Sequence, residues 1–468
     1  MKAFTKAVSV FQLFKRALKG EEQNFTEGSI NRAIFLLSIP MILEMAMESL
    51  LAVVDIFFVS RLHSNDAVAA VGLTESTIAV VYCIAMGLGM AATAMVARRV
   101  GEKDMNGAAI AAVQAIYIGI ACSIIVSITG LIFYKDLLRL MGASEDVVTI
   151  GSGYTKWMFV GNATIMLLFL VNAIFRGAGN AAIAMRSLWI ANILNMILDP
   201  LLIFGWGPVP SLGVEGAAIA TNIGRATGVL YQLYYLVGEK GIVKIRKENI
   251  MINGEIIVRL LKVSAGSMGQ FLISTASWLF LAKIVSNFGS AAFAGYTFAI
   301  RVIIFTILPS WGMANAAATL VGQNLGAQKP ERAEKSVWKA GFLNMIFLGF
   351  ISIVFSFASE AILNFFTADP EVIRYGTQCL QIVAFGYILY GYGMVITQSF
   401  NGAGDTRTPT ILNLFGFWFF QIPLAYVLSM KLDFGGTGVF WAIAIAESAM
   451  AIVGILIFRR GKWKTVKI

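Results

Sequence analysis

Apolar residues run along this chain in long blocks, without the alternation of a half-buried strand or the one-sided period of a surface helix. About 20 consecutive apolar residues cross a bilayer as a helix. Short polar segments such as SRLHSND, GEKDMNG and GAQKPE separate the blocks. The pattern therefore predicts an all-α polytopic membrane protein. Its twelve expected spans are 32–60, 68–97, 105–134, 147–175, 182–206, 212–237, 256–287, 291–323, 335–358, 371–400, 408–430 and 436–458.

Composition agrees with this pattern. The chain is 58% hydrophobic and 13% charged, whereas a soluble domain has about 25% charged residues. Its 45 glycines suit close packing between helices in lipid. The three cysteines lie in separate apolar blocks and there is one histidine, so no spacing indicates a transition-metal centre. We expect no disulfide and no cofactor.

The basic residues predict the orientation of the chain. By count, 27 of the 36 lysines and arginines fall in the N-terminal segment, the C-terminal tail and every second connection between spans. Basic connections stay on the cytoplasmic side. Both termini are therefore expected in the cytoplasm of a multi-pass plasma (inner) membrane protein. The net charge of +10 is then a topology signal with attraction to anionic lipid, and nucleic acid is not an expected partner.

The two halves of the chain resemble each other. FRGAGN at 175–180 matches FNGAGD at 400–405, and VARRVGEKDMNGA at 96–108 matches VGQNLGAQKPERA at 321–333. Six spans in each half predict a parallel repeat related by an axis along the membrane normal. Two such bundles facing a central cleft allow alternating access. The predicted domains are an N-lobe at 31–237, a linker at 238–255, a C-lobe at 256–460 and a basic tail at 461–468.

The first thirty residues precede the first span. Phe4, Val8, Phe11, Phe14 and Leu18 recur at steps of three or four residues, among several lysines. This spacing predicts an amphipathic helix on the membrane surface within segment 1–30. A disordered cytoplasmic tail is the alternative.

Polar residues inside the fifth span indicate a functional site. Asn195 and Asp199 lie one helical turn apart in the apolar stretch ANILNMILDPLLIFGWG at 191–207. A carboxylate in a membrane span marks an ion or substrate pathway by default. Asp55 in the first span is expected at a similar depth, and Thr221 and Asn172 can add neutral oxygens. Such oxygens suit Na⁺, or the two acids can share a proton. Simple hydrogen bonding between helices is the structural alternative.

Comparison of the halves strengthens the functional interpretation. Asp199 aligns with Ile422, Asn195 with Trp418, and Asp55 with Trp278 or Leu281. The fold therefore does not require these acids. In the first span Glu48 precedes Asp55 by seven residues and shares its face.

Pro40 lies near the inner end of the same span. Proline removes a backbone hydrogen bond, so we expect a bend there and a possible moving part.

These features together resemble the MATE (multidrug and toxic compound extrusion) family. The resemblance rests on FRGAGN with FNGAGD, on VGQNLGAQKPERA, and on Pro40 followed by Asp55, and it covers residues 24–460. It is closer to the DinF-like branch, because spans seven and ten carry Gln270 and Gln398 where NorM-like members have acids. The resemblance implies the MATE fold and a cation site. That site falls on Asp55, Asn195, Asp199 and Thr221, with Tyr154 and Asn172 in the surrounding polar network.

The resemblance implies a secondary antiporter that exports cationic or aromatic drugs in exchange for Na⁺ or H⁺. We expect a monomer. A flippase for lipid-linked saccharide is the alternative within the same superfamily, and it would need cations such as Arg225, Lys283 or Arg301 to bind phosphate. An enzyme is not expected, because the GAGD of 402–405 lies at a connection and is explained by the repeat. Aromatic residues of the second half, among them Trp278, Tyr387 and Tyr390, suit lipophilic cations.

Overall fold

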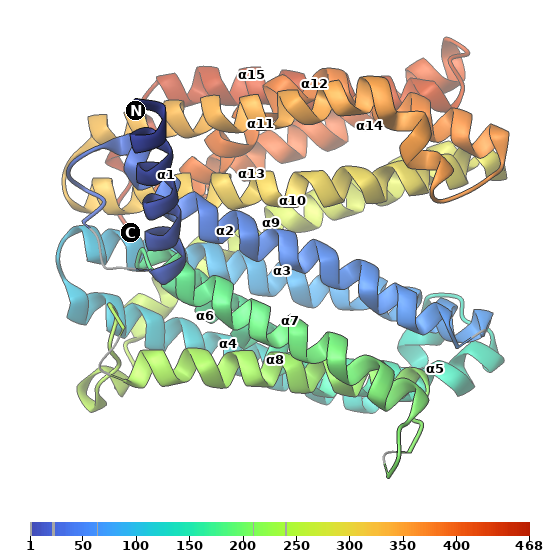
Figure 1. Cartoon of the computed structure of the whole chain (residues 1–468), viewed down its shortest axis with the longest axis horizontal. Helices are drawn as coiled ribbons and strands as arrows, with labels where there is room; N and C mark the ends of the chain where they lie inside the picture. Colours follow the sequence, from blue (N-terminus) through green and yellow to red (C-terminus); the bar gives the residue numbers. More distant parts are fainter. Residues whose placement is uncertain (1, 21–23, 63, 209, 239–240) are drawn as a thin grey trace. The chain divides into compact units, whose positions relative to one another are not determined.

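The computed structural model of the chain describes residues 2–20, 24–62, 64–208, 210–238 and 241–468. Side chains are described except at 2–10, 52, 56 and 60. The side chains of Phe4 and Val8, and residues 239–240 of the predicted linker, therefore lie outside the described part. Every element within that part is a helix, as the apolar blocks predicted (Figure 1).

The first half of the chain holds eight helices, of which the first precedes the spans. They are α1 Lys2–Lys19, α2 Ile30–Ser60, α3 Asn65–Gly101, α4 Met105–Leu140, α5 Glu145–Val160, α6 Asn162–Gly177, α7 Ala181–Phe204 and α8 Val214–Val237.

A short 3₁₀ turn, η1 at Lys247–Ile250, leads into the second half. There the helices are α9 Gly254–Ser286, α10 Ser290–Gly326, α11 Pro330–Asn364, α12 Pro370–Ala403, α13 Arg407–Asn413, α14 Ile422–Tyr426 and α15 Gly436–Arg459. Two π-helical stretches, η2 at Leu414–Gln421 and η3 at Val427–Lys431, join α13 and α14 into one span, and η4 at Lys462–Thr465 ends the chain.

Among the described residues, nine helices are long and apolar enough to cross a membrane, or ten when α5 and α6 count as one bent span. With α2 and α8 these make the twelve predicted spans. The bend of 42° between α5 and α6 was not predicted. It falls at Gly161, where the Asn162 side chain donates to the Phe159 carbonyl at 2.6 Å and thereby satisfies a backbone group beside the break.

The chain forms two compact units. The first comprises residues 1–23 and 43–265, and the second comprises 24–42 and 266–468. Helix α2 is continuous from Ile30 to Ser60, yet its first part is grouped with the second unit. The boundary falls between Ile42 and Leu43, two residues after Pro40. These boundaries differ from the predicted lobes in two places, since 24–42 is grouped with the second unit and 256–265 with the first.

The internal repeat is visible in the backbone. Helices α3 and α10 each have 37 residues, and α8 and α15 each have 24. After α3 and α10, Lys103 and Gln328 both take the left-handed conformation, with φ of 64° and 57°. After α6 and α12, Gly179 and Gly404 both have φ of 87°. Left-handed positions end helices, so both halves use the same turns at the same places.

The first glycine of each repeated GAG motif is needed for close packing. A Cβ on Gly177 of α6 would lie 2.8 Å from the Thr93 carbonyl oxygen of α3. A Cβ on Gly402 of α12 would lie 2.3 Å from the Ala318 carbonyl oxygen of α10. Backbone atoms cannot move aside as a flexible side chain can, so both positions exclude any larger residue.

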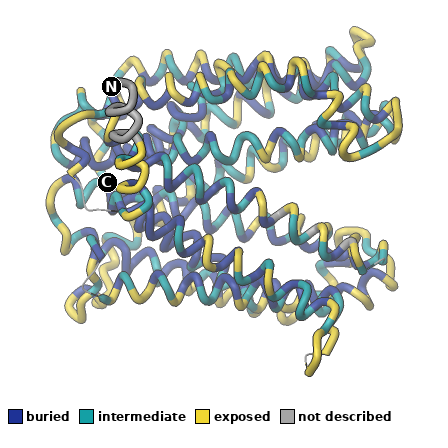
Figure 2. The backbone as a smooth tube through the Cα atoms, in the orientation of Figure 1, coloured by how far each residue is buried: buried dark blue, intermediate teal, exposed yellow. Residues whose placement is uncertain are grey.

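Each unit buries its own core and exposes apolar side chains outward. Buried and exposed positions recur along individual helices (Figure 2). Along α4, for example, Ile124, Ile125 and Ile128 are all more than half exposed. Apolar surface of this kind faces hydrocarbon in a membrane protein, because lipid tails are as apolar as these side chains.

Helix α1 is tied to α7 within the first unit. The Arg186 guanidinium donates to the carbonyl oxygens of Leu18 and Lys19 at 2.6 and 2.7 Å, at the C-terminal end of α1. Cations stabilise that end of a helix. Phe11 remains 69% exposed, so an apolar side chain is available for a surface. Contact of this helix with a membrane stays a prediction.

The repeated glycines yield a stability prediction. Gly177→Ala and Gly402→Ala should each destabilise the fold by about 1–3 kcal/mol, because the added methyl overpacks a helix crossing. Thermal unfolding in nanodiscs would measure the loss. Gly72→Ala on α3, where no atom lies within 4 Å of the added Cβ, is the matched control and should not lower stability. Equal behaviour of all three variants would contradict the close-packing argument.

Candidate functional site

The predicted site residues of α7 and α8 meet inside the first unit. The Asn195 side chain donates to Asp199 Oδ1 at 3.3 Å and to Thr221 Oγ1 at 3.1 Å. All three residues are buried. Gly224 brings the two helices together, since a Cβ there would lie 2.5 Å from the Ala191 carbonyl oxygen. The four-residue spacing of Asn195 and Asp199 thus presents one polar face of α7 to Thr221.

Asp55 of α2 completes this group. Its carboxyl lies near the carboxyl of Asp199, close enough for the two side chains to interact. Two carboxyl groups can share a hydrogen bond only when one carries a proton, and two ionised ones can adjoin only around a cation. The structure therefore brings together all four residues of the predicted cation site.

Three oxygens of this group lack a partner. Asp55 Oδ1, Asp199 Oδ2 and Asn195 Oδ1 are buried and accept no hydrogen bond from the described residues. A buried acceptor without a donor costs free energy. Carboxylate and amide oxygens are the ligands that a hard cation such as Na⁺ prefers, and a proton would satisfy the same oxygens. The donor set fits either ion, while the described residues contain no group of three or more His, Cys, Asp or Glu side chains that could hold a metal.

Arg225 was not predicted as a residue of this site. It lies on α8 one helical turn after Thr221, and its Nη2 donates to the Tyr82 hydroxyl at 2.7 Å. Arg225 is buried and interacts electrostatically with Asp55 and Glu48. Its Nη1 has no hydrogen-bond acceptor among the described residues. The spacing from Thr221 was the signal that could have identified it.

Polar pairs continue along α2 and α7. The Asn192 side chain donates to Glu48 Oε2 at 3.3 Å. Glu48 and Asp55 are seven residues apart on α2, and Asn192 and Asp199 are seven apart on α7. The two helices therefore present polar side chains to each other at two levels, about two helical turns apart. Glu48 and Asn192 form one level, and Asp55 and Asp199 form the other.

Asn172 belongs to a different polar cluster. Its side chain donates to Glu44 Oε1 at 3.0 Å, and Arg176 Nη1 forms an ion pair with the same oxygen at 2.6 Å. Ser187 and Gln232 donate to Asn172 Oδ1 at 2.8 and 2.5 Å. This cluster joins α2, α6, α7 and α8, and no hydrogen bond within the described residues links it to Asp199.

Two further predicted residues lie elsewhere. Tyr154 of α5 is buried in the apolar core of the first unit and interacts electrostatically with Asp55. Pro40 lies in the part of α2 that is grouped with the second unit. The helix continues through it without a break.

The second unit has neutral residues at the corresponding positions of its fifth span. The Trp418 indole donates to the Ile273 carbonyl at 3.2 Å, and Ser277 donates to Gln421 Oε1 at 3.2 Å. Gln270 and Asn401 exchange hydrogen bonds at 2.9 and 3.2 Å. These bonds hold α9 to the neighbouring spans without any carboxylate.

Buried acids, a buried arginine and an internal repeat inside a bundle of apolar helices are features of polytopic membrane transporters. The family model MatE matches the chain twice, at residues 40–201 and 267–427, once in each half. The chain belongs to the MatE family, the MATE family that its motifs resemble, and it is a transporter, not an enzyme. The two matches also reproduce the repeat.

Named relatives and a solved structure match nearly the whole chain. The "Probable multidrug resistance protein YoeA" of Bacillus subtilis is 26% identical over 95% of this chain and 97% of its own. The "Multidrug export protein MepA" of Staphylococcus aureus is 26% identical over 94% and 96%. A solved structure of an outward-facing multidrug resistance MATE family transporter has a TM-score of 0.89 at 27% identity, covering 96% of this chain and 100% of that chain.

The Glu44 cluster yields a second prediction. Glu44→Gln breaks a buried ion pair and should lower the free energy of unfolding by about 3 kcal/mol. Glu48→Gln, one turn along the same helix, is the matched control, because Glu48 lies within ion-pair distance of no described residue, its hydrogen bond comes from an amide, and it loses only the electrostatic interaction with Arg225. Thermal unfolding of both variants in nanodiscs would check this. Equal stability of the two variants would contradict a structural role for Glu44.

Proposed function

We propose that this protein is a secondary multidrug efflux antiporter. It exports lipophilic cationic or aromatic compounds in exchange for Na⁺ or H⁺ by alternating access. The coupling ion binds Asp55, Asn195, Asp199 and Thr221. The observation that carries the proposal is the proximity of the Asp55 and Asp199 carboxyls, each of which has one buried oxygen that accepts no hydrogen bond from the described residues. The cargo class is supported by the names of the relatives, which match nearly the whole chain.

Ion binding shortens the distance between α2 and α7 at the level of Asp55 and Asp199. At about 4 Å and an effective dielectric constant of about 20, two ionised carboxylates repel each other by about 4 kcal/mol. A bound cation or proton removes this repulsion and draws Asp55 toward Asp199. Because α2 is one helix whose first part groups with the second unit, a shift of Asp55 is carried along it toward Pro40. Ion occupancy thereby biases one conformation over the other.

Arg225 supplies a permanent positive charge to the site. When the ion leaves, its guanidinium balances Asp55 and Glu48, with which it interacts. These acids and Tyr82 occupy its surroundings, which favours a cation as the ligand over the phosphate of a lipid-linked saccharide. A flippase would need a basic pocket free of carboxylates.

The same proposal includes the setting of the protein. We place it as a monomer in the plasma membrane with both termini in the cytoplasm. The distribution of 27 of the 36 basic residues supports this orientation. Reactivity of single cysteines introduced at the two ends toward an impermeant reagent would test it.

The acid pair is tested by neutral substitution. Asp55→Asn and Asp199→Asn should each abolish ion-driven export of ethidium from proteoliposomes, because the amide carries no charge for the ion to neutralise. A Na⁺ gradient and a proton gradient, imposed separately, identify the coupling ion. Asp136→Asn, an exposed acid of the same unit, is the control and should transport normally. Full ion-driven export by either site variant would refute the assignment.

Removal of the arginine charge should tighten ion binding. In Arg225→Gln, the coupling ion becomes the main positive charge near Asp55. The half-saturating ion concentration should therefore fall on the order of tenfold, the factor that corresponds to about 1.4 kcal/mol, and the maximal export rate should fall as ion release slows. Arg225→Lys retains the charge and should remain close to the unmodified protein. Unchanged ion affinity in Arg225→Gln would show that this residue is not part of the site.

A further inference from the structure

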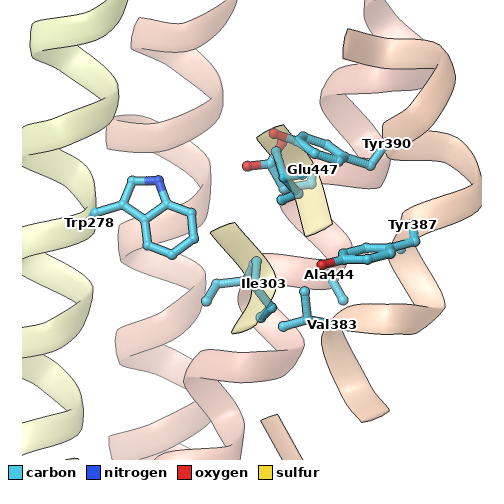
Figure 3. A pocket seen from close by; sticks show the side chains of 10 residues that line it. Trp278, Ile303, Val383, Tyr387, Tyr390, Ala444 and Glu447 are labelled. Carbon is cyan, nitrogen blue, oxygen red and sulfur yellow. The ribbon is translucent and has the colours of Figure 1, made fainter. Parts of the chain in front are cut away.

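A pocket in the second unit lies between four helices. Its walls come from α9, α10, α12 and α15, and Figure 3 shows the side chains that point into it. Three aromatic residues, Trp278, Tyr387 and Tyr390, line it together with aliphatic residues such as Ile303 and Val383 and the single acid Glu447. Trp278 faces Glu447 across the pocket, and the Tyr390 ring lies beside the carboxyl group (Figure 3).

Glu447 has no counter-charge among the described residues. Within the described residues it takes part in no ion pair and accepts no hydrogen bond, although it lies in the middle of a predicted span. Every other residue that lines the pocket is uncharged. An unpaired carboxylate in such surroundings is costly, so a ligand that carries a positive charge would be favoured here.

This pocket is the repeat counterpart of the Arg225 region. Glu447 is the twelfth residue of α15, and Arg225 is the twelfth residue of α8, which has the same length. Ile307 of the pocket occupies the place in α10 that Tyr82 occupies in α3. Trp278 aligns with Asp55. The first unit thus places an arginine near an acid, and the second places an acid near an indole. Because the charge at this position is positive in the first unit and negative in the second, the second unit is suited to a different ligand.

The chemistry of the walls selects the kind of cation. A hard metal cation such as Ca²⁺ takes about six or more oxygen ligands, and here one carboxylate and two hydroxyls are available. Aromatic faces attract organic ammonium groups, which are weakly hydrated. The cavity volume of about 20 Å³ admits about one group of the size of water, so an ammonium head group fits and the apolar body of the ligand would lie outside this volume.

We propose that Glu447, Trp278 and Tyr390 form a subsite for the protonated amine of a lipophilic cargo. This inference deepens the proposed function, since it names the second unit as the place where the charge of the cargo is recognised. It does not depend on the ion site of the first unit, because the pocket contains no residue of that unit.

Equilibrium binding without any gradient tests the subsite. The full chain in nanodiscs would be titrated by calorimetry with phenylbutylamine, a cation at neutral pH, and with phenylbutanol, its neutral isostere. Glu447→Gln should weaken amine binding on the order of tenfold, as expected for loss of a charge-assisted contact, and leave alcohol binding unchanged. Trp278→Leu should weaken amine binding several-fold through loss of the aromatic face. Glu360→Gln, an exposed acid of α11, is the matched control.

The outcomes separate this inference from the proposed function. Asp199→Asn should bind the amine normally while it loses ion-driven export. Equal amine affinity in Glu447→Gln, Trp278→Leu and the unmodified protein would overturn the subsite, as would loss of amine binding in Asp199→Asn alone. If the unmodified protein fails to export any compound but Glu447→Gln still lowers amine affinity, the proposed function falls and the subsite stands.

Discussion

The contact between the carboxyls of Asp55 and Asp199 is the constraint on which the first unit depends. Two acids on different helices can adjoin in a low-dielectric interior only when a cation or a proton stands between them. The surrounding groups follow from this requirement. Asn195 donates to both Asp199 and Thr221, and Arg225, held by the Tyr82 hydroxyl, provides a fixed positive charge nearby. The buried oxygens without donors mark the place at which we propose that the coupling ion binds.

Close helix packing makes such a site possible. Gly224 allows α8 to approach α7 at the level of Asn195, and Gly177 allows α6 to approach α3. Van der Waals packing and hydrogen bonds replace the hydrophobic driving force that is weak between helices in lipid. The Glu44 cluster then joins four helices of the same unit, beside the point at which α2 passes from one compact unit to the other. Polar groups in this unit therefore form two separate clusters, the proposed ion site and the hydrogen bonds that attach four helices to one another.

The repeat explains how one fold carries two kinds of chemistry. Helices α3 and α10 have equal lengths, as do α8 and α15, and both halves use the same left-handed turn positions, so these parts of the two backbones correspond. The intramembrane charges do not correspond, since Arg225 and Glu447 occupy the same place on α8 and α15. Residues that the backbone requires, such as Gly177 and Gly402, occur in both halves. Residues that differ between the halves are free of that requirement and are the better candidates for function.

The sequence by itself determined the twelve spans, the internal repeat and the two intramembrane aspartates, Asp55 and Asp199. Long apolar blocks, repeated turn motifs and charges within apolar blocks are local properties of the chain. The sequence also identified Asn195 and Asp199 as one face, since helical spacing dictates that. Only the tertiary structure decided which groups meet. In the structure, Asn172 bonds to Glu44 and not to Asp199. Arg225 lies near enough to Asp55 to interact with it electrostatically. The bend at Gly161 and the pocket around Glu447 also emerged only there, because both depend on how helices distant in sequence pack against each other.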